Sequence, residues 1–62
     1  MKKQQFTITL DEWDSWLMAL LCKRITWEGV ADCAAGKDET ENMIAVIERI
    51  RSQLAGQGIA PR

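Results

Sequence analysis

Residues 16–22 read Trp16-Leu17-Met18-Ala19-Leu20-Leu21-Cys22, an uninterrupted apolar run in a chain of 62 residues. On a helix, successive residues step about 100° around the axis, so seven apolar residues in a row cover every face. One small core cannot bury all of them. The run is far shorter than the ~20 residues of a membrane-spanning helix, so we expect no membrane association. It predicts that a second copy or another protein covers part of this helix.

The short chain predicts a single domain, residues 1–62, that needs reinforcement. A domain of this size buries only about 60% of the surface of its unfolded form, and the usual reinforcements are disulfides, a metal or oligomerisation. Two cysteines without any histidine do not supply the four ligands of a structural zinc site. Cys22 and Cys33 would lie ~16 Å apart on one helix, so we interpret both as reduced thiols. Oligomerisation remains, and a homodimer is predicted.

The N-terminal segment and the charge balance limit where the protein acts and what it binds. Lys2 and Lys3 are followed by alternating residues rather than by the continuous apolar stretch of an export signal. Together with reduced cysteines, this favours the cytoplasm of a bacterial host cell. The net charge of −1 provides no global basic field for nucleic acid or anionic lipid. Nucleic-acid binding would depend on local patches.

Residues 5–10 alternate in the period-two pattern of a half-buried strand. One side carries Phe6, Ile8 and Leu10, and the other carries Gln5, Thr7 and Thr9. A lone strand is not stable in water. Two interpretations therefore stay open for residues 1–10: a strand that pairs with a second copy, or an extended arm that lies on the helices.

The first helix is predicted to begin at residue 11, because Thr9-Leu10-Asp11-Glu12 has the residues of a capping box. Its course near Thr26 allows two interpretations. The helix continues with a kink to residue 35, or Thr26 caps a new helix with Ile25 and Val30 as its hydrophobic staple. We favour the kinked helix over 11–35, because the three- and four-residue spacing of apolar residues persists, and we expect Gly36 to cap its end.

The second helix is predicted over residues 38–55, with Asp38 as its cap and Glu41 three residues later. Its apolar residues repeat at steps of four, three and four, as in the seam of a coiled coil. Gly56 is expected to stop it, and residues 56–62 to form a flexible tail. The predicted fold is mainly α, a helical hairpin with a short N-terminal extended segment, forming a homodimer.

The residue inventory argues against catalysis. The chain has no histidine, no tyrosine and no glycine-rich phosphate loop. Neither Ser15 nor Ser52 has a neighbouring base in a recognisable arrangement, and the carboxylates cluster at helix starts, where capping accounts for them. We expect the protein not to be an enzyme, and we assign no catalytic, cofactor-binding or metal-binding residues.

Three tryptophans are a heavy use of the largest side chain in so short a chain. Each buries on the order of 200 Å², more than a two-helix hairpin encloses by itself, and tryptophan is enriched at the centres of protein interfaces. We therefore expect the tryptophans at a contact between proteins. The predicted interface consists of Trp13, Trp16, Leu17, Leu20, Leu21, Trp27, Met43, Ile47, Ile50 and Leu54.

Two resemblances suggest functions. The stretch Phe6-Thr7-Ile8-Thr9-Leu10-Asp11-Glu12 resembles the opening of a ribbon-helix-helix repressor, in which two such strands pair across a dimer and outward polar side chains enter the major groove. This resemblance implies that Gln5, Thr7 and Thr9 read bases. In size, acidity and two-helix layout, the whole chain resembles small proteins encoded in the early regions of lambdoid phages, which implies a compact helical homodimer acting on host or phage regulation.

The leading hypothesis is a non-catalytic module, a homodimer that binds an unidentified host or phage protein and serves a regulatory role. The alternative is a ribbon-helix-helix-like DNA-binding regulator. The all-round apolar run of residues 16–22 favours the first.

Overall fold

The computed structural model describes residues 2–62, and Met1, the first residue of the predicted arm, lies outside the described residues. The elements are α1 (Glu12–Arg24), α2 (Trp27–Cys33) and α3 (Lys37–Gly56). Residues 2–62 contain no strand, which confirms the mainly α fold class. Within the same residues, no helix combines the length and the apolar character that a bilayer crossing requires.

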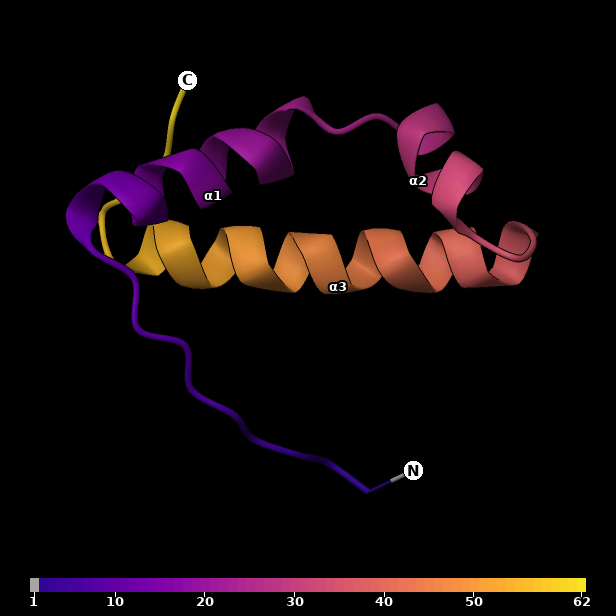
Figure 1. Cartoon of the computed structure of the whole chain (residues 1–62), viewed down its shortest axis with the longest axis horizontal. Helices are drawn as coiled ribbons and strands as arrows, with labels where there is room; N and C mark the ends of the chain where they lie inside the picture. Colours follow the sequence, from indigo (N-terminus) through magenta and orange to yellow (C-terminus); the bar gives the residue numbers. More distant parts are fainter. Residues whose placement is uncertain (1) are drawn as a thin grey trace.

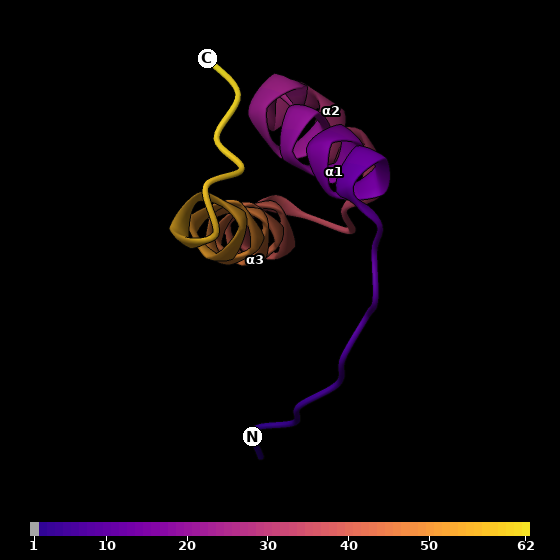
Figure 2. The ribbon, with the colours of Figure 1, turned by 90° about the vertical axis from the view of Figure 1, so that its left-hand side faces the viewer.

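The helices form a single layer. α1 and α2 follow one another along one side of α3, which runs antiparallel to both (Figure 1). Figure 2, seen along the helices, shows the row of α1 and α2 beside α3, with no further helix over either side of the pair. The Cα atoms extend over only 15 Å in the shortest direction. Stable domains usually consist of two packed layers around a core, and this chain supplies one.

α1 begins at Glu12, one residue after the predicted start, and its N-cap is Asp11 rather than the predicted Thr9. The Asp11 backbone is extended, and its Oδ1 accepts a hydrogen bond from the backbone N–H of Asp14 at 2.7 Å. Asp11 therefore satisfies one of the unpaired N–H groups of the first turn. The capping box at Thr9 was a wrong prediction, because a better acceptor lies two residues later.

The predicted continuous helix over 11–35 is wrong, and the alternative start at Thr26 is confirmed. α1 ends at Arg24, Ile25 and Thr26 are extended, and Oγ1 of Thr26 accepts from the backbone N–H of Gly29 at 3.0 Å. A Cβ at Gly29 would lie 3.3 Å from that oxygen. The cap supplies a local hydrogen bond to the first turn of α2, which compensates for breaking the helix.

Gly36 does not cap the end of the first helical segment. α2 ends at Cys33, and Gly36 is instead the N-cap of α3, two residues before the predicted cap Asp38. No side chain caps α3. Thr40 donates both its hydroxyl, at 2.9 Å, and its N–H, at 3.0 Å, to the carbonyl of Gly36. These two bonds explain how a polar residue is buried here.

The end of α3 is set by Gly58, not by Gly56. Gly58 has a positive φ of 85°, the left-handed conformation that glycine adopts without strain. Its N–H donates to the carbonyl of Ala55 at 3.0 Å, and the N–H of Ile59 donates to that of Leu54 at 2.9 Å. This is the Schellman pattern. It turns the predicted flexible tail back beside α1 (Figure 2), where Ile59 is half-buried.

The interior of the hairpin is very small. The buried side chains among the described residues are Ala19, Cys22, Val30 and Thr40. All four are small, which allows α1 and α2 to lie close to α3. Because hydrophobic stabilisation scales with the apolar area removed from water, so few and such small side chains give the isolated chain little stability.

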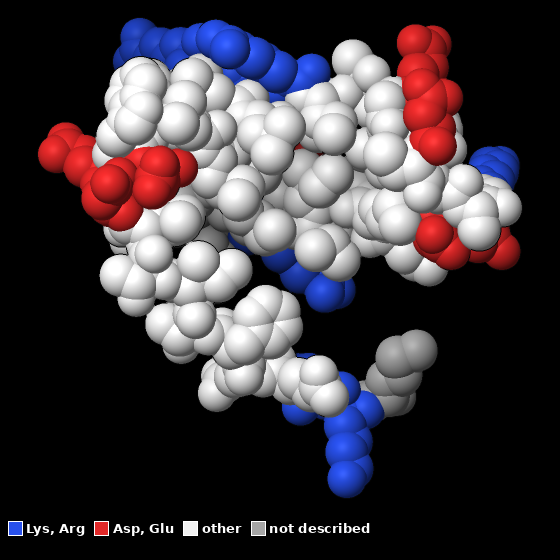
Figure 3. Space-filling view, viewed as in Figure 1, with Lys and Arg blue, Asp and Glu red and all other residues white. Residues whose placement is uncertain are grey.

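The N-terminal arm, here residues 2–10, is extended and stands clear of the helices (Figures 1 and 3). Phe6 is 82% exposed and Ile8 is 68% exposed. The arm therefore does not lie on the helices of its own chain. Its pairing with a second copy stays a prediction.

The Thr26 cap can be tested by substitution. Thr26→Ala removes the acceptor for Gly29 and should lower the free energy of unfolding by about 1 kcal/mol. Thr26→Ser keeps a hydroxyl oxygen at about the same position and should lower the free energy of unfolding by only about a few tenths of a kcal/mol. Urea unfolding followed by circular dichroism at one fixed chain concentration measures both. Equal stability of the Ala variant and wild type would show that this hydrogen bond does not hold α2.

Candidate protein-interaction surface

The chain exposes more surface than a folded monomer of its size. Its solvent-accessible surface is 5603 Å², whereas a compact monomer of 7.0 kDa exposes about 4,000 Å². The arm accounts for part of the excess and the open layer of helices for the rest. A standard protein interface removes about 800 Å² from each partner. The excess is thus large enough for one interface or more.

One side of the layer is apolar. Because α1 and α3 are antiparallel, the residues that directly precede the inward-facing positions lie on the same side in both helices. Ala19 and Cys22 are inward on α1, so Met18 and Leu21 precede them; Thr40, Ile44 and Ile47 face inward on α3. The apolar residues of this side form the apolar face: Met18, Leu21, Met43 and Val46, with Ile50 one turn beyond Val46. The acids Asp14 and Glu39, which precede Ser15 and Thr40, lie at its ends. Figure 3 shows an uncharged surface across the middle of both helix rows, with acidic residues toward its ends.

A groove lies at the α2 end of the apolar face. It has a volume of about 420 Å³, and only apolar atoms form its exposed walls. It is lined by Ile25, Val30, Cys33, Glu39, Asn42, Met43, Val46 and Ile47. Val46 is 49% exposed although it sits within an apolar environment. Exposed apolar grooves of this kind are typical of surfaces that bind a protein segment.

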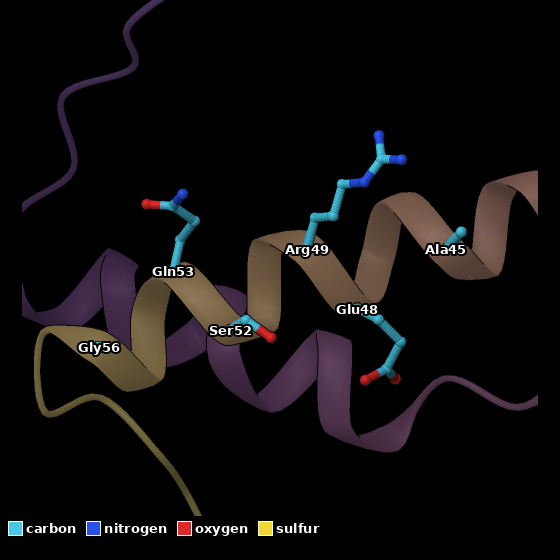
Figure 4. Close-up of a pocket in the computed structure, with 6 residues that line it drawn as sticks. All are labelled: Ala45, Glu48, Arg49, Ser52, Gln53 and Gly56. Atoms are coloured by element: carbon cyan, nitrogen blue, oxygen red, sulfur yellow. The ribbon is translucent and has the colours of Figure 1, made fainter.

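The opposite side of α3 is polar. A pocket there is lined by residues of α3 alone: Ala45, Glu48, Arg49, Ser52, Gln53 and Gly56. In Figure 4, Arg49 and Gln53 point away from α1, while Glu48 points to the α1 side. Glu48 and Arg51 form an exposed ion pair at 3.9 Å, which contributes little stability. No groups converge in this pocket, so the polar side offers no site for chemistry.

A second cleft, with aromatic and acidic walls, lies at the start of α1. It has a volume of about 710 Å³ and is lined by Asp11, Glu12, Trp13, Trp16, Gly58 and Ile59. Trp13 is 65% exposed and Trp16 41% exposed. The turn at Gly58 brings the tail against these rings. Exposed tryptophans in a partly formed cleft are typical of binding hot spots before the partner arrives.

The structure separates the residues of the predicted interface into two groups. Met43, Ile47, Leu54 and Leu20 are half-buried, so the chain itself covers part of the predicted seam. Trp13, Trp16, Leu17, Leu21, Trp27 and Ile50 are exposed. Leu21 and Ile50 share the apolar face, whereas Trp13 and Trp16 line the cleft at the other end. Their role at an interface stays a prediction.

Sequence reasoning missed several residues of the groove. Ile25, Val30, Cys33 and Val46 were not assigned to the interface, because the favoured continuous helix over 11–35 places Ile25 within a helix rather than at a break. The available signal was the staple pair that flanks Thr26. Once Thr26 caps a new helix, Ile25 and Val30 come together, and both line the groove.

The residues of the DNA-binding alternative lie together on the arm. Gln5, Thr7 and Thr9 are exposed on an extended segment, so their side chains are accessible, and Lys2 and Lys3 precede them. Their role as base readers stays a prediction. Within residues 2–62, no three or more His, Cys, Asp or Glu side chains are grouped so that they could hold a metal ion.

The two cysteines are free thiols in different surroundings. Cys22 is buried between α1 and α3, and Cys33 is exposed at the groove. Burial raises the pKa of the Cys22 thiol, the carboxylate of Glu48 raises it further, and the guanidinium of Arg51 lowers it by a smaller amount. Since the thiolate is the nucleophile, Cys22 stays protonated and unreactive at neutral pH.

The fold and surfaces define a small helical protein with an open apolar face. By its sequence, the chain belongs to the family of unknown function DUF7706, whose model matches residues 1–62. No curated protein and no solved structure gives a significant match.

The reactivity of Cys22 checks the packing of α1 against α3. In a Cys33→Ser background, which leaves one thiol, alkylation of Cys22 at pH 8 should be about tenfold slower in the native protein than in denaturant. Its rate should rise only above the pH at which a free thiol ionises, because its folded pKa is raised. By linkage, the Cys22 contribution to stability is complete below the ordinary thiol pKa and falls as the pH rises through the raised value. Equal rates in native and denatured protein would contradict the buried position.

Proposed function

We propose that this protein is a non-catalytic protein-interaction module that acts as a homodimer. The observation that supports this proposal best is a single layer of helices with an uncovered apolar face. Five apolar residues of α1 and α3 share that face, and a groove with only apolar walls continues it toward α2. A second copy of the chain supplies the missing layer, as in antiparallel helix bundles.

The partner protein of this dimer has a separate place to bind. Trp16 follows the inward-facing residue Ser15 on α1, so it lies on the side of the layer opposite to Met18 and Leu21. A dimer that covers the apolar face therefore leaves the cleft of Trp13 and Trp16 open. The resemblance to small phage proteins extends the proposal: the dimer acts as a regulatory protein on a host or phage protein in the bacterial cytoplasm.

Paired charge substitutions on α3 test the dimer. Val46→Glu places a carboxylate on the apolar face and should raise the dissociation constant by about a hundredfold or more, because a charge buried at an interface without a partner is costly. Ala45→Glu, at the adjacent exposed position on the polar side, should leave it unchanged. Light scattering behind a sizing column, over a concentration series in reducing buffer, gives both values.

Either of two results would overturn the proposal. In the first, the wild-type chain is still a monomer at high micromolar concentration. In the second, Val46→Glu and Ala45→Glu weaken the dimer by the same amount. The second result would show that the apolar face does not form the contact. Circular dichroism at the same concentrations separates loss of association from loss of helix.

A second candidate function is DNA binding by the arm, which the exposure of Gln5, Thr7 and Thr9 behind Lys2 and Lys3 favours. It predicts binding to mixed genomic duplex fragments at low salt. This binding should weaken steeply as salt rises, because phosphate contacts release counterions, and should fall in a Thr7→Ala/Thr9→Ala variant. Absence of any gel shift at low salt would exclude it.

A further inference from the structure

We propose that the dimer is formed by arm exchange: the apolar side of the arm of each copy occupies the groove between α2 and α3 of the other copy. This inference rests on the proposed homodimer and specifies how its two chains engage. It accounts together for the two most exposed large apolar side chains, Phe6 and Ile8, and for an apolar groove of about 420 Å³ with no occupant from its own chain.

The arm and the groove match in shape and polarity. Phe6, Ile8 and Leu10 lie on one side of an extended segment, since successive side chains of extended backbone point to opposite sides. The groove presents Ile25, Met43 and Val46 to them. Thr7 and Thr9 then face outward and stay in water. When a peptide binds in extended form, its alternate side chains enter pockets of the partner and give the specificity.

The length of the arm limits how far it can enter the groove of its own chain. Asp11 and Ile25 stand at opposite ends of α1, and the fourteen helical steps between them span ~21 Å. The five residues from Asp11 back to Phe6 span at most ~18 Å when fully extended. The Cα of Phe6 therefore stops short of Ile25, and that of Ile8 stops shorter still. The arm of a second copy does not have this limit on its length.

The charges at the ends of the arm and groove are complementary and give the arm a direction. Lys2 and Lys3 lie a few residues before Phe6, and the first turn of α3 carries Asp38 and Glu39. Glu39 also lines the groove. An arm whose N-terminus points to the first turn of α3 brings these opposite charges together, whereas the reverse direction separates them. Exposed charge pairs fix orientation more than affinity.

The area to be covered fits an exchanged dimer. Each chain has about 1,600 Å² of surface beyond that of a compact monomer. A two-fold exchange covers one arm and one groove on each copy. This is an isologous contact, in which the same two patches meet in both directions. The excess exceeds the about 800 Å² per partner of a standard interface.

The first experiment compares the two sides of the arm by light scattering over a concentration series. Phe6→Ser/Ile8→Ser removes the apolar side and should raise the dimer dissociation constant by about tenfold or more. Thr7→Ser/Thr9→Ser changes the same number of positions on the outward side and should leave it unchanged. Phe6, Ile8, Thr7 and Thr9 are all exposed, so neither change should unfold the chain, and circular dichroism checks this.

The second experiment places one cysteine on the arm. Ile8→Cys should form a disulfide with the native Cys33 of the other copy under mild oxidation, giving a species of twice the chain mass without reductant. Thr7→Cys, the neighbouring residue on the outward side, should crosslink far less, because a disulfide needs Cα atoms within about 7 Å and converging Cβ atoms. Adding Cys33→Ser to Ile8→Cys should abolish the product.

The outcomes separate the two proposals. A wild-type monomer overturns both. A dimer that Val46→Glu disrupts, but that keeps its dissociation constant in Phe6→Ser/Ile8→Ser, overturns arm exchange and leaves the homodimer standing. Equal crosslinking through Ile8→Cys and Thr7→Cys also overturns the seating of the arm. Loss of affinity in the apolar arm variant, together with Cys33-dependent crosslinking through position 8, supports it.

Discussion

The close approach of α1 and α2 to α3 rests on four small residues, Ala19, Cys22, Val30 and Thr40. Small side chains let helix axes lie near one another, but they remove little apolar area from water. These contacts therefore set how the helices lie against one another, but they contribute little to the stability of the fold. Every larger apolar residue is left at least partly in solvent. The proposed homodimer supplies a second layer, which is the physical complement to a contact of this kind.

The break at Ile25 and Thr26 turns this contact into a binding surface. A continuous helix along α3 would present one straight seam. The break instead lets Val30 of α2 pack inward while Ile25 stays at the surface, and the groove opens between them and Met43. The hydrogen bond from Gly29 to Thr26 joins the two neighbours of the groove residues Ile25 and Val30, and so helps to shape the groove. Gly58 acts similarly at the other end, where its turn places Ile59 beside Trp16.

Much of the fold followed from sequence patterns, and the errors share one cause. The helix over 37–56 was predicted within about one residue at each end, because its apolar spacing is strong and long. Which residues cap the helices (Asp11, Thr26, Gly36 and Gly58) depends instead on single hydrogen bonds and backbone angles, which several neighbouring residues could supply. The groove was missed for the same reason, since Ile25 and Val46 come together only after the break is placed correctly. The exposed tryptophans were recognisable from composition alone, but which side of the layer each occupies required the structure.

The two faces of the layer have different consequences for a dimer. If two copies meet through their apolar faces, their opposite sides point outward in two directions. Each outward side carries one cleft with Trp13 and Trp16 beside the acids Asp11 and Glu12. A two-fold dimer therefore presents two equivalent clefts, which gives it the means to engage two sites on one partner and to gain affinity through the higher effective concentration of the second contact. In the proposed dimer, association therefore does more than stabilise a small chain, because it also sets the number and spacing of the proposed partner-binding clefts.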